Sequence, residues 1–185
     1  MMLPPNSTRL FDADQVQAAY DDLASRLNDS LPDKEVMLLP VMTGGLFAAV
    51  ELARRVRRPL QIDYVHASRY RGQTRGAKIQ WLRWPELPHE SRTILLVDDI
   101  FDEGYTLQAI RDRLQGHCQV VTAVLVRKQH ARGLPRDWVD HHALEVPDRY
   151  VFGCGMDYRE YFRELPEIWA LPNELDGKSD DSDRF

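Results

Sequence analysis

Cysteine is scarce in this chain of 185 residues, which carries only Cys118 and Cys154. Two thiols cannot supply the disulfide framework of a small secreted domain, and they lack the spacing of a zinc site. No apolar run approaches the length needed to cross a bilayer. The stretch MMLPPNSTRLFDADQ also lacks the basic segment and apolar core of a secretory signal. We therefore expect free thiols, no membrane partner and a cytoplasmic protein.

An excess of positive charge is also missing. The chain has 24 Lys and Arg against 29 Asp and Glu, a net charge of −5. Non-specific binding to nucleic acid normally needs a basic field, so we expect no nucleic-acid partner. The G-x-G-x-x-G fingerprint of dinucleotide enzymes is absent after the first predicted strand. The remaining balance, 43% apolar and 29% charged, is typical of one globular domain at this length.

Helical and strand patterns alternate along the chain. Helical spacing of apolar residues covers 12–29, 46–56 and 105–116, and short apolar runs typical of strands cover 35–42, 59–67, 93–99 and 118–128. Strands that alternate with helices form parallel units with right-handed crossovers. The sequence therefore predicts an α/β fold with an open, mainly parallel central sheet flanked by helices. Residues 1–172 form a single predicted domain, and the acidic tail at 173–185 is expected to be disordered.

Carboxylates gather at the end of one predicted strand and directly after it, in the segment ILLVDDIFDEGYTLQAI at 94–110. In an open parallel sheet, ligands bind beyond the carboxyl ends of the strands, and Asp98 and Asp99 lie at such an end. Gly104 and Thr106 then lead into a helix whose first N–H groups and dipole favour a phosphate. A sugar phosphate satisfies both halves of this pattern, because its hydroxyls can donate to the carboxylates. A hard cation such as Mg²⁺ suits the same oxygen ligands.

The fragment VDDIFDEGYTL resembles the phosphoribosyl-diphosphate signature of the type I phosphoribosyltransferases. This resemblance implies the fold of that family, with a small hood formed by the N-terminal segment and residues at about 147–172. It also implies that Asp102 accepts a proton from the purine during catalysis. The signature residues that it assigns to phosphoribosyl diphosphate are Asp98, Asp99, Asp102, Glu103, Gly104, Tyr105 and Thr106.

Two further segments resemble the hypoxanthine-guanine members of that family. PVMTGGLFAAVEL is similar to their diphosphate loop, which implies that Thr43 and Gly44 contact phosphoribosyl diphosphate, with Thr43 in place of a frequent basic residue. IDYVHASRYRGQTRGAKI is similar to their lid, which implies a mobile loop at about 68–80 that begins with Ser68, Arg69 and Tyr70. A lid would exclude water while a reactive sugar cation forms.

The C-terminal segment PDRYVFGCGMDYREYFRELPEI closely resembles the 6-oxopurine pattern. The resemblance implies that Tyr150 stacks on the purine and that the backbone of Val151 reads the edge of the base. It places Asp157 near the base and a metal ion, and Arg163 at the diphosphate. In the family, a lysine at the end of the preceding strand contacts the exocyclic oxygen of the base. VLVRKQ offers both Arg127 and Lys128 for this role; spacing does not decide between them, and we favour Lys128.

The implied function is purine salvage: hypoxanthine or guanine reacts with phosphoribosyl diphosphate to give IMP or GMP and diphosphate. The implied cofactor is Mg²⁺, with Asp98, Asp99 and Asp157 as its contacts, and the implied assembly is a homodimer or homotetramer. A non-catalytic regulator that senses nucleotides or phosphoribosyl diphosphate with the same fold is the alternative. The preference among hypoxanthine, guanine and xanthine is left open by the sequence.

Overall fold

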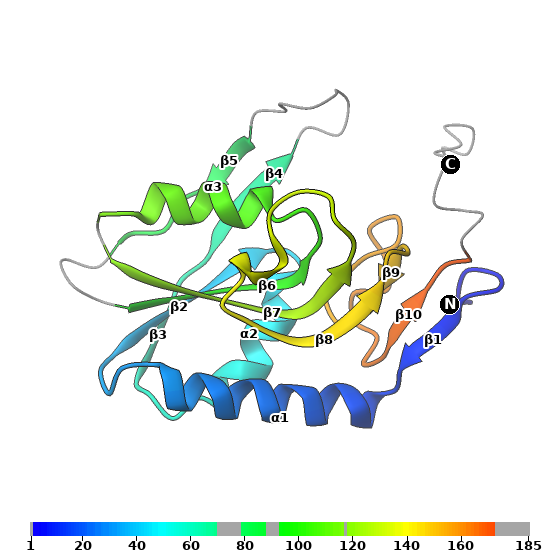
Figure 1. Ribbon diagram of the computed structural model, residues 1–185, viewed down its shortest axis with the longest axis horizontal. Coiled ribbons are helices and arrows are strands. Elements are labelled where there is room, and N and C mark those ends of the chain that lie inside the picture. Colours follow the sequence, from blue (N-terminus) through cyan, green and yellow to red (C-terminus); the bar gives the residue numbers. More distant parts are fainter. Residues whose placement is uncertain (1, 70–78, 88–92, 117, 173–185) are drawn as a thin grey trace.

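A computed structural model describes residues 2–69, 79–87, 93–116 and 118–172. Its main feature is a central sheet in the order β5-β4-β2-β6-β7-β8, with β3 also paired to β2 (Figure 1). Every pairing in it is parallel except that of β4 with β5. The predicted α/β fold is confirmed. The strands are β2 (Val36–Met42), β3 (Leu60–Ile62), β4 (Val65–Arg69), β5 (Ile79–Arg83), β6 (Thr93–Phe101), β7 (Gln119–Gln129) and β8 (His141–Pro147).

Helices cover both faces of this sheet (Figure 1). The helices α1 (Ala13–Ser30) and α2 (Gly45–Ala53) pack on one face, and α3 (Tyr105–Leu114) packs on the other. Side chains of β6 alternate between the two cores: Leu95 faces α1 and α2, whereas Leu96 faces α3. The sheet is therefore buried on both sides, which explains why its central strands are continuous apolar runs.

Local signals set the start of α1. The side chain of Asp12 accepts a hydrogen bond from the N–H of Gln15, and the side chain of Gln15 accepts one from the N–H of Asp12. This reciprocal capping box satisfies two N–H groups that the helix itself leaves without partners. None of the helices in the described part of the chain is long and apolar enough to span a membrane. Both cysteines are free thiols, as expected.

The two ends of the domain meet in a second, antiparallel sheet. Its strands are β1 (Thr8–Phe11), β9 (Val151–Phe152) and β10 (Ile168–Ala170), in the order β1-β10-β9, and a single turn of 3₁₀ helix, η1 (Arg136–Trp138), precedes β8. Phe152, Phe162 and Leu171 form a small core of their own beneath this sheet. This unit is the hood, and it lies beside the central sheet (Figure 1).

Three parts of the central sheet differ from the sequence-based expectations. The single strand expected at 59–67 is two short strands, because the chain leaves the sheet at Asp63, whose carboxylate accepts hydrogen bonds from the N–H groups of Tyr64 and Glu86. Both ends of the loop expected at 68–80 lie in strands, since Arg69 in β4 pairs with Ile79 in β5, and residues 70–78 lie outside the described residues. The strand β8 was not expected, because its sequence, HHALEVP, lacks the apolar alternation of the other strands. Tyr70 and the predicted tail at 173–185 lie outside the described residues.

The double burial of the sheet predicts a large loss of stability in the variant Leu96→Ala. Leu96 is fully buried in β6, so its truncation should lower the free energy of unfolding by about 2–5 kcal/mol. Leu82→Ala in β5 is the matched control, because Leu82 is 52% exposed and such substitutions change stability by about 0.5 kcal/mol or less. Urea unfolding followed by circular dichroism measures both. Equal losses in the two variants would contradict this packing.

Candidate active site

An acidic pair lies near the end of the central strand. The strand β6 carries Asp98 and Asp99 between its neighbours β2 and β7, and it continues to Phe101, which pairs with Arg127 of β7. Asp99 is only 8% exposed. A side chain at position 44 would overlap the carboxylate of Asp99, so only glycine lets the turn between β2 and α2 pass so close to the acid.

The acidic pair is electrostatically costly. Burial, and then the negative charge of Asp99, raise the pKa of Asp98 well above its usual range. Burial also raises the pKa of Asp99, and the positive charge of Arg163 opposes both shifts. The pair therefore gains from any hydroxyl donor or cation that takes the place of a bound proton.

The turn that follows β6 has the geometry of an anion site. Gly104 has a φ of 79°, in the left-handed region, and a side chain there would overlap the ring of Phe101. The helix α3 begins at the next residue, so the N–H groups of its first turn have no partners within the helix and its dipole favours an anion. A cavity of about 290 Å³ opens here. Its lining consists of Asp98, Asp99, Ile100, Asp102, Glu103, Gly104, Tyr105, Thr106, Leu107 and Arg132.

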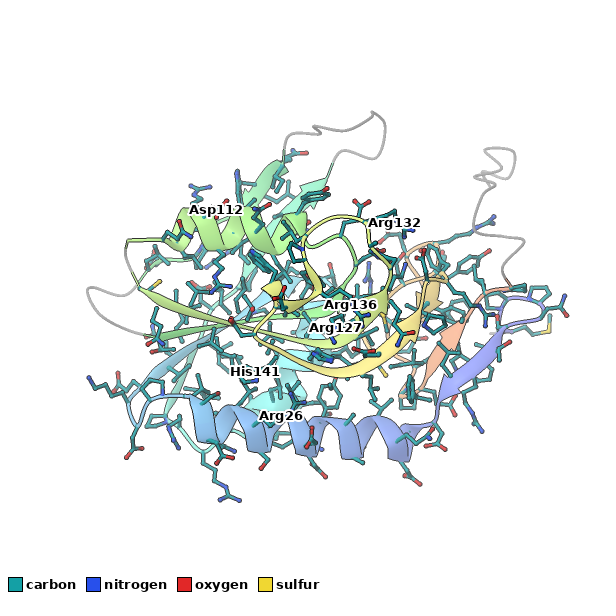
Figure 2. The ribbon with its side chains drawn as sticks, in the orientation of Figure 1. Arg26, Asp112, Arg127, Arg132, Arg136 and His141 are labelled. Carbon is teal, nitrogen blue, oxygen red and sulfur yellow. The ribbon has the colours of Figure 1, made fainter. Side chains whose placement is uncertain are left out.

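Arg132 is the one cation among the described residues that line this cavity. It lies on the loop that follows β7, beyond the end of that strand (Figure 2). Two hydrogen bonds, of 2.5 and 2.7 Å, join its guanidinium to the carboxylate of Asp148. Its Nη2 also lies 3.9 Å from Oδ1 of Asp102. A positive group is thus held at the rim of an otherwise acidic cavity.

Asp102 is bound by two donors, one near the end of β7 and one directly after it. The ammonium of Lys128 lies 2.9 Å from its Oδ2, and Nε2 of His130 lies 2.5 Å from its Oδ1. Burial acts to raise the pKa of Asp102, but the hydrogen bond and charge of Lys128 and the hydrogen bond of His130 outweigh it, so the pKa lies below its usual range. Asp102 is therefore ionised at neutral pH and can accept a proton.

The structure separates the two candidate cations at the end of β7. Successive residues of a strand point to opposite faces, and only Lys128 reaches Asp102. Arg127 instead pairs with Glu145, and its Nη1 donates to the carbonyl of Arg136 at 3.0 Å. Arg127 and Arg136 accordingly lie side by side, away from Arg132 (Figure 2).

Four predicted residues lie on or near the hood rather than in the cavity lining. Tyr150 is 37% exposed and meets Tyr158 edge to face, with ring centroids 6.0 Å apart, and Val151 is buried in β9. Arg163 pairs with Asp157 at 2.8 Å and donates to the carbonyl of Gly155 at 2.6 Å.

Gly155 connects these hood residues to the acidic pair. A side chain at position 155 would overlap the carbonyl of Gly44 and crowd Asp99. The turn of the hood that carries Gly155 is therefore packed against the predicted diphosphate loop. This contact places Arg163, which is bonded to Gly155, close enough to act on the charge of the acidic pair.

The predicted metal contacts do not form one cluster. The described residues contain no group of three His, Cys, Asp or Glu side chains that could hold a metal ion. Asp157 is engaged by Arg163 and by the N–H of Glu160. The structure thus brings Asp98 and Asp99 together without Asp157, and the role of each as a metal contact stays a prediction.

The predicted diphosphate loop is the turn between β2 and α2. The peptide bond between Met42 and Thr43 is cis, and Gly44 precedes the first residue of α2. A side chain at Gly45 would crowd the carbonyl of Val97, so α2 starts directly on β6. Thr43 and Gly44 therefore reach the acidic pair from the neighbouring strand.

Comparison with known proteins identifies the family. Residues 6–160 match the model of the phosphoribosyl transferase domain, which is most of the chain. This chain belongs to that family. The resemblance inferred from VDDIFDEGYTL is confirmed.

Similar proteins point to one branch of the phosphoribosyltransferases. The hypoxanthine-guanine phosphoribosyltransferase of Staphylococcus epidermidis is 26% identical over 172 residues, which are 91% of this chain and 96% of the relative. That of Mycobacterium avium is 28% identical, over 88% of this chain and 84% of the relative. A hypoxanthine phosphoribosyltransferase structure from Staphylococcus aureus is 25% identical with a TM-score of 0.82, covering 92% of this chain and 94% of that one. A hypoxanthine-guanine phosphoribosyltransferase structure from Bacillus anthracis, also 25% identical with a TM-score of 0.82, covers 89% and 98%.

Sequence reasoning missed two residues of this phosphoribosyltransferase site. His130 and Arg132 lie in QHARG, directly after β7. The sequence offered one signal, because side chains that follow a parallel strand lie at the same edge as those that follow its neighbours. The carboxylates that His130 and Arg132 contact are 16 to 30 residues away in the chain, and only the fold reveals them.

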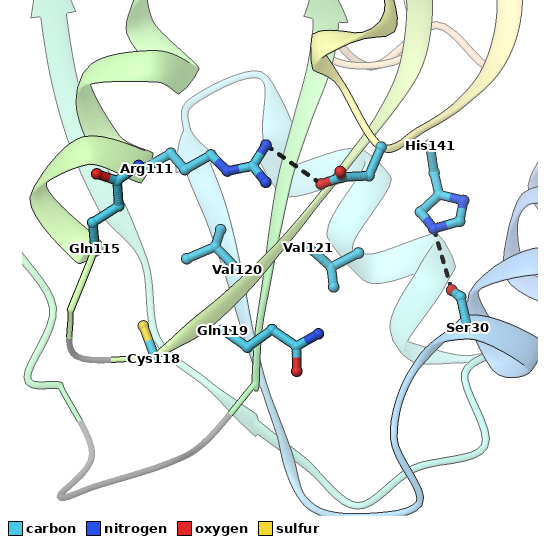
Figure 3. A pocket seen from close by; sticks show the side chains of 9 residues that line it. Ser30, Arg111, Gln115, Cys118, Gln119, Val120, Val121 and His141 are labelled. Carbon is cyan, nitrogen blue, oxygen red and sulfur yellow. Dashed lines mark hydrogen bonds and ion pairs between the residues drawn. The ribbon is translucent and has the colours of Figure 1, made fainter.

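A second cavity, of about 480 Å³, lies at the starts of β7 and β8, at the opposite end of these strands from Lys128 (Figure 3 shows its lining). Four of its polar residues form two pairs: Arg111 lies 3.7 Å from Asp140, and His141 lies 3.2 Å from the hydroxyl of Ser30 (Figure 3). It contains none of the predicted site residues. The cavity beside the acidic pair is therefore the candidate active site of this phosphoribosyltransferase.

The raised pKa of Asp98 predicts that Asp98→Asn stabilises the free protein. A carboxyl whose pKa is higher in the folded state favours folding less as pH rises, so the neutral amide should raise Tm at pH 8 in EDTA. At this chain length each kcal/mol corresponds to about 2–4 °C. Below about pH 4 the gain should vanish, because the wild-type carboxyl is then protonated.

Asp33→Asn is the matched control for this experiment, since the Asp33 side chain is 99% exposed. Thermal unfolding of both variants across pH 4–8 gives the comparison. An Asp98→Asn variant no more stable than Asp33→Asn at pH 8 would show that the acidic pair carries no such cost.

Proposed function

We propose that this phosphoribosyltransferase transfers the phosphoribosyl group of phosphoribosyl diphosphate to hypoxanthine or guanine, giving IMP or GMP and diphosphate. The observation that carries the proposal is the pairing of Lys128 with Asp102 at 2.9 Å, next to an anion site at the start of α3. The relatives named above are hypoxanthine-guanine or hypoxanthine enzymes, and none of them supports the non-catalytic regulator.

A 6-oxopurine fits a lysine beside a carboxylate. Its exocyclic oxygen O6 and ring nitrogen N7 are neighbours on one edge of the base. The ammonium of Lys128 can donate to O6, while the carboxylate of Asp102 accepts the proton of N7. A 6-amino group would instead present a donor to the ammonium, so the same pair disfavours adenine.

The other half of the site suits a phosphorylated pentose. The 5-phosphate of the pentose binds the N–H groups of the first turn of α3, and Arg132 adds positive charge at the rim of the cavity. The ribose hydroxyls donate to Asp98 and Asp99, which relieves the cost of their burial. Base and sugar are thereby held in one orientation.

The reaction forms a bond between a purine nitrogen and the anomeric carbon and breaks the bond from that carbon to diphosphate. The proton of N7 passes to Asp102. Positive charge develops on the sugar, and negative charge leaves with the diphosphate. The turn at Thr43 and Gly44, at the start of α2, and Arg163 are the groups that receive the leaving anion. Tyr150 stacks on the base, and the backbone of Val151 meets its edge.

Mg²⁺ is the cofactor that we propose. The carboxylates of Asp98 and Asp99 supply the hard oxygen donors that this ion prefers, and Mg²⁺ typically takes one or two carboxylates and completes its shell with substrate oxygens and water. When bound, the ion would neutralise part of the charge of the diphosphate. A third contact from Asp157 belongs to the same proposal, as do the lid with Ser68, Arg69 and Tyr70, the cytoplasmic location and a homodimer or homotetramer.

An assay with a panel of bases tests the activity. Purified protein, phosphoribosyl diphosphate and Mg²⁺ should form nucleotide and diphosphate with hypoxanthine or guanine and at least about 100-fold less with adenine. Xanthine completes the panel. Binding of phosphoribosyl diphosphate without any product would contradict the proposal and favour the regulator.

Asp102→Asn is the control variant of that assay. The amide keeps the shape of the side chain but cannot accept the N7 proton, so turnover should fall by about 10²–10⁴-fold. Binding of phosphoribosyl diphosphate, measured by calorimetry, should change little. Unchanged turnover would eliminate Asp102 as the base.

Lys128→Ala should weaken the choice between 6-oxo and 6-amino bases. The ratio of kcat/KM for hypoxanthine to that for adenine should fall by about tenfold or more, since the donor to O6 is lost. Lys34→Ala is the matched control, because Lys34 is exposed and far from the cavity in the sequence and the fold. An unaltered ratio in Lys128→Ala would remove Lys128 from base selection.

A further inference from the structure

The ring of His130 is buried beside Asp102, the proposed proton acceptor. The reaction described above gives this ring no role. Its side chain is 5% exposed, and it lies in the segment directly after β7, residues 130–134, which we call the clasp loop. Both ring nitrogens have partners. Nε2 lies 2.5 Å from Oδ1 of Asp102, and Nδ1 lies 3.1 Å from the backbone nitrogen of Arg132.

These two partners determine where the ring proton lies. The backbone N–H of Arg132 can only donate, so Nδ1 of His130 must present its lone pair. The neutral imidazole therefore carries its proton on Nε2 and donates it to Asp102. The other tautomer would direct two N–H groups at each other and leave a lone pair facing a carboxylate.

The clasp loop itself is fixed to the turn that holds Asp102. The N–H of Leu134 donates to the carbonyl of Glu103 at 3.0 Å. A side chain at Gly133 would overlap the backbone of Glu103, so the two segments are in close contact. Since the backbone of the same loop also orients the ring, His130 and Asp102 are held by one rigid unit.

The two oxygens of Asp102 thus have different partners. Oδ2 is bound by Lys128, whose long, flexible side chain can turn to the oxygen of an incoming base. Oδ1 is bound by a ring that the backbone fixes in place. Entry of the base can release Oδ2 while Oδ1 stays bound.

We propose that His130 is a positioning residue: its neutral Nε2–H tautomer holds Oδ1 of Asp102 so that Oδ2 meets the N7 proton of the purine. This inference rests on the proposed function. It assigns to the clasp loop a part in turnover without direct contact with the substrate. It also specifies which oxygen of Asp102 takes the proton.

The tautomer can be measured directly. Protein labelled with ¹⁵N on histidine gives long-range ¹H–¹⁵N spectra in which each tautomer has a distinct pattern, and the spectrum of His130→Gln identifies the signal of His130. At pH 7.5 that signal should show a protonated Nε2 and an unprotonated Nδ1. A proton on Nδ1, alone or together with Nε2, would overturn the assignment.

Kinetics test the role in positioning. His130→Leu removes the donor, so kcat should fall on the order of 10–100-fold while KM for phosphoribosyl diphosphate changes by less than about twofold. His130→Gln supplies an N–H donor at a similar reach and should recover most of the loss. His141→Leu is the matched control in the second cavity (Figure 3) and should keep wild-type kcat.

Thermal unfolding of each variant separates lost function from lost fold. If His130→Leu is folded and as fast as wild type, the inference is wrong while the proposed function stands. If His130→Gln is as slow as His130→Leu although both are folded, the hydrogen bond from His130 to Asp102 does not set the rate, and the inference is wrong. If wild type forms no nucleotide with any 6-oxopurine, the proposed function fails, and this inference fails with it.

Discussion

The proposed site depends on negative charge held at the end of the central strand, where the fold itself gains nothing from it. Asp98 and Asp99 follow a fully apolar run, and burial makes their ionised forms expensive. Replacement of such groups by apolar residues would lower the free energy of unfolding little or not at all, so their presence argues for a ligand that needs them. Arg163 offsets part of the charge, and Gly44 allows the backbone to pass the acid closely.

The pKa of Asp102, three residues after Asp99, is shifted in the opposite direction. Lys128 and His130 lower its pKa, so it stays ionised where its neighbours resist ionisation. The transfer to a purine requires carboxylates in two different roles. Asp98 and Asp99 accept hydrogen bonds from the sugar hydroxyls, and Asp102 accepts the proton of the purine. These roles differ because the ends of β6 and β7 lie side by side, which brings the donors of β7 and its following loop to Asp102.

Much of this arrangement could be predicted from the sequence because it is local. The apolar run, the acids, the glycine and the helix start lie within 94–110, and their order alone gives a strand, an anion site and a rim of carboxylates. Contacts across the chain could not be predicted in the same way. Spacing did not decide between Arg127 and Lys128, and the register of β7 against β6 was needed to show that only Lys128 reaches Asp102.

His130 and Asp157 show two other limits of sequence reasoning. A lone histidine in a polar segment gives no sign that it will be buried against a carboxylate 28 residues earlier. Asp157 matches the family pattern, yet its partner in the fold is Arg163. In both cases the neighbour in space, rather than the residue type, sets the chemistry.

The most direct test of the central claim is a crystal structure with bound GMP. The account predicts the phosphate at the first turn of α3, beside Arg132, with the ribose hydroxyls on Asp98 and Asp99 and the base edge at Lys128 and Asp102. A mononucleotide bound with its phosphate anywhere else, for instance in the second cavity at the starts of β7 and β8, would contradict it.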